Sequence, residues 1–124
     1  MILTWISKRF YTITHPNTSN VSVWQGHKIE IKCFYVLQGA FKIMLIKPDQ
    51  WDNLSPVQTI EEYSIKQEDN MVLKIPGGYI NGFKATVPNS KLMVFADATL
   101  TESKLYDVRF DKRLWYDWTK MSSL

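Results

Sequence analysis

The sequence predicts a small all-β domain, a sandwich or a barrel, from three observations. Short runs of β-branched and aromatic residues alternate with turn residues, at a spacing of roughly eight to twelve positions. At 124 residues, the chain has the length of one domain that can bury its own core. Aromatic residues make up 14% of the chain, a surplus that suits a lined pocket or a subunit interface.

Four strands are predicted in the first part of the chain. They are residues 9–14 (RFYTIT), 21–24 (VSVW), 28–37 (KIEIKCFYVL) and 40–47 (AFKIMLIK). Gln25 and Gly26 interrupt the alternation after the second of these runs. Gln38 and Gly39 form a tight turn between the last two, which predicts that these two strands pair as a β-hairpin.

The rest of the chain contains shorter strands and one helix. The predicted strands are residues 57–65, 71–75, 81–85 and 91–96, separated by polar or glycine-rich turns. Thr101 is a suitable helix-capping residue, so residues 102–118 are predicted to include a short C-terminal helix. No internal repeat is visible, and we expect one domain over residues 1–124.

The charge distribution argues against a nucleic-acid partner. The formal net charge is +3, but the lysines are scattered along the chain and form no basic run. We interpret most of them as solvated surface residues, with one or two available for a phosphorylated small molecule.

Cysteine content and hydropathy predict a cytoplasmic protein. Cys33 is the only cysteine, so an internal disulfide is impossible. Its apolar neighbours favour a buried strand residue over a thiol nucleophile. Lys8 and Arg9 follow too few apolar residues for a signal peptide, and no apolar run approaches a membrane-spanning length.

Two motifs give the chain a more specific resemblance. The first is residues 24–28 (WQGHK), followed by Lys32 and the turn at Gln38 and Gly39, and the second is residues 75–83 (IPGGYINGF). In this order they resemble the paired motifs of cupins, and more narrowly the dTDP-4-dehydrorhamnose 3,5-epimerases and the related sugar 3,4-ketoisomerases. Residues 92–97 (LMVFAD) with Glu102 and Ser103 are similar to the ketoisomerase tail. The resemblance covers residues 8–118 and implies a jelly-roll barrel, the double-stranded β-helix of cupins.

The resemblance assigns roles to five residues of this chain. His27 falls on the second histidine of the family's pair, and Lys32 matches the lysine that stabilises an enolate oxygen, so both are candidate catalytic residues. Gln25 occupies the position of the base histidine in the epimerases, and Asn81 the position of the histidine in the second motif. With Tyr79, the aromatic residue of that motif, they are predicted to contact the substrate.

The departures from the family pattern weaken the enzymatic prediction. Glutamine does not titrate, so Gln25 cannot serve as a general base, whereas His27 could replace it if its ring points into the barrel. Residues 25 and 27 share one face of a strand, whereas Lys32 would lie on the opposite face unless Gly26 forms a bulge or the chain bends before Ile31. The structural alternatives are a hydrogen-bonded His27, a solvent-facing Lys32 and a turn-forming Asn81.

We expect no metal and no cofactor at this site. The four positions that hold a metal in many cupins read Gln25, His27, Lys32 and Asn81, a poor ligand set for a divalent cation. His15 precedes Pro16 in a predicted turn and receives no role. Residues 115–118 (WYDW) are predicted to pack or to form an interface.

Three functions therefore compete. The first is an epimerase or ketoisomerase that acts on a dTDP-4-keto-6-deoxyhexose in bacterial surface-polysaccharide synthesis, as the resemblance implies. The second is a cupin that binds a sugar or nucleotide sugar without turnover, and the third is a purely structural domain. The resemblance also implies a homodimer formed through the N-terminal strand, since an unpaired aromatic edge is a liability.

Overall fold

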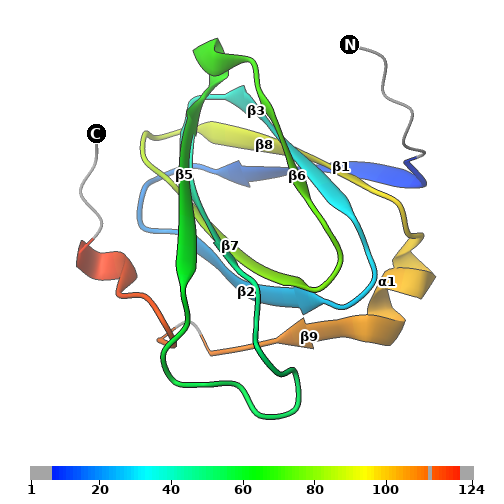
Figure 1. The fold of residues 1–124 in the computed structure, drawn as a ribbon. Helices are drawn as coiled ribbons and strands as arrows, with labels where there is room; N and C mark the ends of the chain where they lie inside the picture. Colours follow the sequence, from blue (N-terminus) through cyan, green and yellow to red (C-terminus); the bar gives the residue numbers. More distant parts are fainter. Residues whose placement is uncertain (1–6, 112, 121–124) are drawn as a thin grey trace.

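Two antiparallel β-sheets face each other in the computed structural model, which describes residues 7–111 and 113–120 (Figure 1). The first sheet has the order β1-β8-β3-β6 and consists of β1 (Arg9–His15), β8 (Ser90–Ala96), β3 (Lys32–Gln38) and β6 (Val72–Ile75). The second has the order β5-β4-β7-β2-β9 and consists of β5 (Ile60–Lys66), β4 (Ala40–Ile46), β7 (Tyr79–Ala85), β2 (Val21–His27) and β9 (Asp107–Arg109). The all-β prediction is therefore confirmed.

The helices are short. They are α1 (Leu100–Tyr106) and the two 3₁₀ turns η1 (Gln67–Asp69) and η2 (Trp118–Lys120). Thr99 rather than Thr101 caps α1: its side chain accepts a hydrogen bond from Glu102 N, and the Glu102 carboxylate accepts one from Thr99 N. The predicted helix is present, and it starts two residues earlier because only Thr99 has an acidic residue three positions later. None of the helices in the described part of the chain has the length and hydropathy of a membrane-spanning segment.

The predicted hairpin of β3 and β4 is wrong. β3 pairs with β6 and β8, whereas β4 pairs with β5 and β7 in the other sheet. Gly39 turns the chain from one sheet to the other with a φ of 76°. A Cβ at this position would collide with the Ser90 side chain, so the corner requires glycine both for its dihedral angle and for its space.

Gly39→Ala is expected to lower the free energy of unfolding by about 1–3 kcal/mol, because it adds backbone strain and a steric collision. Gly78→Ala is the matched control, since Gly78 has a φ of 89° but open space where its Cβ would be. Urea denaturation of both variants would measure the difference. Equal losses would show that the Ser90 contact contributes nothing.

The core has two parts because the inner strands β4 and β7 of the second sheet are buried on both faces. Between the sheets lies a cluster that includes Phe34, Phe41, Phe83 and Leu92. The outer cluster contains Trp24, Met44, Ile46, Ile80 and Trp118, against which Trp51 and Trp115 pack. The aromatic C-terminal segment therefore packs, as predicted, and it explains why residues 43–46 of β4 are apolar in succession rather than alternating.

The N-terminal strand lies at an edge of the first sheet. Among the described strands, β1 pairs only with β8, and Phe10 on it is 69% exposed. This position is compatible with the expected dimer, which stays a prediction.

Candidate functional site

A cavity of about 700 Å³ lies between the two sheets. Its walls include Arg9, Tyr11 and Ile13 of β1, Lys32 and Phe34 of β3, Ser22 and Gln25 of β2, Asn81 and Phe83 of β7, and Asp107 and Arg109 of β9. Leu100, Ser103 and Lys104 of α1 complete one end, where β2 ends and β3 begins (Figure 1). The volume is within the range of small-molecule sites.

A β-bulge in β2 brings Gln25 opposite Asn81 inside this cavity. Ser22 pairs with Phe83, so an unbroken antiparallel register would pair residue 24 with Asn81. The register shifts between Ser22 and Gln25, and Gln25 takes that place instead. The same shift leaves Trp24 in the outer cluster, where its side chain is fully buried.

Lys32 reaches the cavity because β2 and β3 belong to different sheets. The predicted strand over residues 28–37 begins only at Lys32, and residues 28–31 carry the chain across from one sheet to the other. The inward faces of the two sheets are opposed, so the alternation in β2 does not determine where Lys32 points. Of the two expected irregularities, a bulge at Gly26 or a bend before Ile31, the structure has the second, and it is a complete change of sheet.

The side chains of Lys32 and Asn81 are buried without a protein partner. Lys32 is 2% exposed and Asn81 is 5% exposed. Within residues 7–111 and 113–120, neither side chain forms a hydrogen bond, and Lys32 forms no ion pair. The polar atoms of Lys32 and Asn81 are not among the described polar atoms that are shut off without a partner, so they open onto the cavity, where a ligand could reach them.

Gln25 is held by β9. Its Nε2 donates to Asp107 Oδ1 over 3.0 Å, and Arg109 Nε donates to Asp107 Oδ2 over 3.1 Å. With the amide nitrogen bound to the carboxylate, the amide oxygen of Gln25 remains available to the cavity.

Arg9 lies at the same end of the cavity. Its Nη2 is 3.2 Å from Glu30 Oε1, and its guanidinium lies 5.2 Å from the centre of the Tyr11 ring. Its Nε and Nη1 atoms are buried without a partner. Burial raises the pKa of Tyr11, so its phenol stays protonated and can donate a hydrogen bond.

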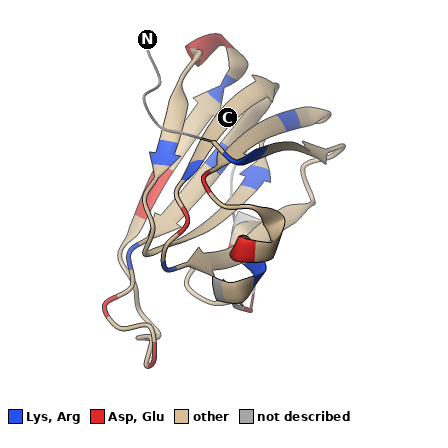
Figure 2. Cartoon of the chain, turned by 90° about the vertical axis from the view of Figure 1, so that its right-hand side faces the viewer, with Lys and Arg blue, Asp and Glu red and all other residues tan. Residues whose placement is uncertain are grey.

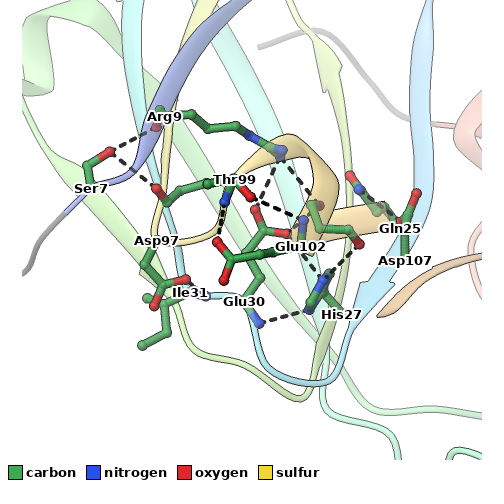
Figure 3. A network of polar contacts seen from close by, with 12 residues as sticks. Ser7, Arg9, Gln25, His27, Glu30, Ile31, Asp97, Thr99, Glu102 and Asp107 are labelled. Carbon is green, nitrogen blue, oxygen red and sulfur yellow. Dashed lines mark hydrogen bonds and ion pairs between the residues drawn. The ribbon is translucent and has the colours of Figure 1, made fainter. Parts of the chain in front are cut away.

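A buried network connects Arg9 to α1 (Figure 3). The Glu30 carboxylate accepts from Arg9 and, over 2.8 Å, from Ser103 Oγ. His27 lies on the other side of this carboxylate, with its Nε2 3.5 Å from Glu30 Oε2. The network therefore fastens α1 to the strands at one end of the cavity.

The fold resembles that of several solved structures. A dTDP-4-dehydrorhamnose 3,5-epimerase from Bacillus anthracis, crystallised with TDP and PPi, superposes with a TM-score of 0.76 at 20% identity, over 98% of this chain and 71% of the other. The sugar 3,4-ketoisomerase QdtA from Thermoanaerobacterium thermosaccharolyticum, in complex with TDP, gives 0.67 at 20% identity over 87% and 70%. A dTDP sugar isomerase from Desulfovibrio desulfuricans gives 0.73 at 18% identity over 94% and 74%.

This chain has the cupin fold of those sugar epimerases and ketoisomerases. The likeness establishes the fold, as the two motifs predicted. No family model and no curated protein matches the sequence.

The cupin cavity contains three of the five predicted site residues. Gln25, Lys32 and Asn81 line it, whereas His27 and Tyr79 are not among its lining residues. Tyr79 packs against the core between the sheets. The expected cluster of Gln25, His27 and Asn81 is therefore reduced to Gln25 and Asn81, with Lys32 added from the other sheet.

The ring of His27 forms hydrogen bonds that stabilise residues 28–31, the segment that crosses from one sheet to the other. Its Nδ1 accepts from Glu30 N over 2.8 Å and from Ile29 N over 3.2 Å. A nitrogen that accepts carries no proton, so Nε2 carries it and donates to Ser103 O over 3.1 Å. Proton transfer by His27 would require breaking one of these bonds.

Two further titratable residues outside the cavity, His15 and Cys33, are buried. His15 is the last residue of β1 rather than part of a turn, and its Nε2 lies 3.0 Å from Ser22 Oγ. Burial lowers the pKa of His15 and raises that of Cys33, which is a buried strand residue as predicted. Among the described residues, no three His, Cys, Asp or Glu side chains gather as a metal site would require.

The polar cavity residues that were not found from the sequence include Arg9, Tyr11, Asp107 and Arg109. The alternation of the first strand, in which Arg9, Tyr11 and Ile13 share one face, could have indicated two of them. Nothing local marks Asp107 and Arg109, because β9 is three residues long and its position depends on pairing with β2.

Proposed function

We propose that this cupin binds a nucleotide sugar in the inter-sheet cavity, with the sugar against Lys32, Asn81 and Gln25 and the diphosphate near Arg9 and Arg109. The observation that carries the proposal is the buried ammonium of Lys32, which faces the cavity without a protein partner. A hydroxyl or carbonyl oxygen of the sugar would accept a hydrogen bond from this ammonium, and the diphosphate would add negative charge to the same cavity.

The charge of the cavity supports an anionic ligand. Its lining residues include four cations, Arg9, Lys32, Lys104 and Arg109, and one carboxylate, Asp107. Figure 2 shows that Lys and Arg lie on several strands of this side of the molecule, whereas most Asp and Glu lie on loops, turns and helices. An excess of positive charge in a cleft concentrates anions there.

The relatives suggest which anion to test. The epimerase from B. anthracis was crystallised with TDP, and a variant of the ketoisomerase QdtA with TDP-4-keto-6-deoxyglucose. Phe10, Tyr11, Phe34 and Phe83 line the present cavity and offer apolar faces for a base or a sugar ring.

TDP is expected to bind, and Arg109→Met is expected to weaken its binding about tenfold, because a charged hydrogen-bond donor to the phosphates is lost. Isothermal titration calorimetry would measure both affinities. Arg113→Met is the matched control: Arg113 also pairs with a carboxylate two residues earlier, Asp111, but does not line this cavity. An equal loss in both variants would mean that only general charge attraction was measured.

A second candidate function is isomerisation or epimerisation of a 4-keto sugar nucleotide, and the position of Lys32 favours it. A fixed cation in a dry cavity stabilises an enolate oxygen. With His27 outside the cavity, the proton would have to be removed by another group, and this is why binding is the first proposal.

The wild-type protein is expected, under this second candidate, to exchange solvent deuterium into the carbon beside the ketone of TDP-4-keto-6-deoxyglucose. Lys32→Met should reduce the exchange by about 100-fold or more, because the enolate loses its cation. Proton NMR would follow the signal, with Lys91→Met on the exposed side of β8 as the control. Absence of exchange in the wild type would exclude the isomerase and leave the binding function.

A further inference from the structure

The amine of Lys32 has the surroundings of a nucleophile. It lies at the start of β3, is 2% exposed and faces a cavity of about 700 Å³. Lysine is rarely buried without a partner, because the ammonium is strongly hydrated in water. The cavity that Lys32 faces is lined by uncharged side chains such as Gln25, Phe34 and Asn81 and by a few charged ones.

The charges near Lys32 are already engaged with one another. Glu30 is paired with Arg9 and accepts from Ser103, and Asp107 is bound by Arg109 and Gln25. Neither carboxylate lies within ion-pair distance of Lys32 in the described part of the chain. Two cations and two carboxylates therefore surround the amine, and no net negative charge holds its proton.

Burial accordingly lowers the pKa of Lys32. Desolvation is the main cause, Glu30 and Asp107 oppose it, and Arg9 and Arg109 add to it. A larger share of this amine is therefore neutral near pH 7 than for a lysine in water. Desolvation and neighbouring cations are the two conditions that activate lysine as a nucleophile towards carbonyl compounds.

We propose that Lys32 forms an imine with the carbonyl carbon of a ligand bound in the cavity. The Nζ lone pair attacks the carbonyl carbon, the C=O π electrons move to oxygen, and a proton passes from nitrogen to that oxygen. In the resulting carbinolamine, the nitrogen lone pair forms the C=N bond while the C–O bond breaks. The hydroxyl group leaves together with the second proton of the nitrogen, as one molecule of water. The identity of the carbonyl ligand rests on the proposed function, whereas the reactivity of Lys32 does not.

An imine would also make a C–H bond of the ligand easier to deprotonate, which matters because no histidine base among the described residues lines this cavity. A protonated imine withdraws electrons from the adjacent carbon more strongly than a ketone does, so a C–H bond beside it is more acidic. The cavity could then activate a keto sugar although Gln25 is not a base and His27 lies outside it.

The test is reductive trapping at pH 7. The protein is incubated with TDP-4-keto-6-deoxyglucose and sodium cyanoborohydride, and the adduct is located by peptide mass spectrometry. We expect one adduct per chain, on Lys32, and its loss when excess TDP fills the cavity. Lys32→Arg keeps the positive charge but cannot form an imine, so its adduct should be lost, whereas Lys91→Arg on β8 should label like the wild type.

A second carbonyl probe separates this inference from the proposed function. Pyridoxal 5′-phosphate carries an aldehyde and a phosphate but no nucleoside or sugar. Its trapping on Lys32 in a protein that does not bind TDP would support the imine and overturn the nucleotide-sugar proposal. TDP binding by calorimetry, with neither probe attached to Lys32 above the level of the exposed lysines, would overturn the imine and leave the proposed function intact. The loss of labelling when TDP is added is measured on the wild-type protein. The test therefore remains valid even if Lys32→Arg does not fold.

Discussion

Lys32→Met is expected to unfold at a higher urea concentration than the wild type and to bind TDP more weakly. Lys32 is 2% exposed and has no ion pair or hydrogen bond within the described residues, so its burial opposes folding, and only the more distant carboxylates of Glu30 and Asp107 offset this cost. Methionine has a similar shape and no charge. The free energy of unfolding should rise by about 1–3 kcal/mol, as when apolar residues replace buried charges elsewhere.

The stability gain of Lys32→Met should depend on pH. The pKa of Lys32 is lower in the folded state than in the unfolded chain, so the unfolded chain binds more protons between the two values. The stability of the wild type therefore increases as pH rises through that interval, and the advantage of methionine shrinks. Urea denaturation of both proteins at pH 7 and at about pH 10, a value near the ordinary pKa of lysine, would measure the difference.

The opposite result would identify Lys32 as a structural residue. If Lys32→Met is less stable than the wild type at pH 7, the ammonium has a stabilising partner and the ligand proposal loses its main support. Lys91→Met is the control for loss of an exposed positive charge, and its stability should hardly change.

Glu30→Gln is expected to lower the free energy of unfolding by about 3 kcal/mol, because it leaves the charge of Arg9 without its counter-charge. The Glu30 side chain is 0% exposed and lies 3.2 Å from Arg9 Nη2, while its second oxygen accepts from Ser103 Oγ. Two Arg9 nitrogens are already buried without a partner, so the guanidinium has little else to compensate it.

The matched control for Glu30→Gln is Glu102→Gln. Glu102 pairs with Lys8 at 3.3 Å, but both side chains are 49% exposed, and glutamine can keep the cap of α1. This exposed pair should contribute about 0–1 kcal/mol. Urea denaturation would compare the two variants, and equal losses would mean that the buried network does not fasten α1 to the strands.

Much of the fold could be predicted because strands leave a local pattern. The alternation in residues 9–14 and the β-branched content of the later runs predicted β1, β7 and β8 to within a few residues. The two motifs predicted the cupin fold, although they make up a small part of the chain. The start of α1 has a local signal as well, because Thr99 and Glu102 have the spacing of a capping box.

The arrangement of the cavity could not be predicted because it depends on pairing between distant segments. The corner at Gly39 has the sequence of a hairpin turn, and only the surrounding sheets decide that β3 and β4 separate. The bulge after Ser22 places Gln25 rather than Trp24 opposite Asn81, and the sequence of β2 does not predict this bulge.

The sequence by itself determined an all-β cupin with an amide at each of two histidine positions, because side-chain alternation and motif order are properties of the chain. Tertiary structure alone decided that Lys32 enters the cavity while His27 forms hydrogen bonds with backbone groups of residues 28–31 and of α1. The physical reason is that a side chain's environment depends on which sheet its strand joins and what covers that sheet, and residues 28–31 change the sheet between these two positions.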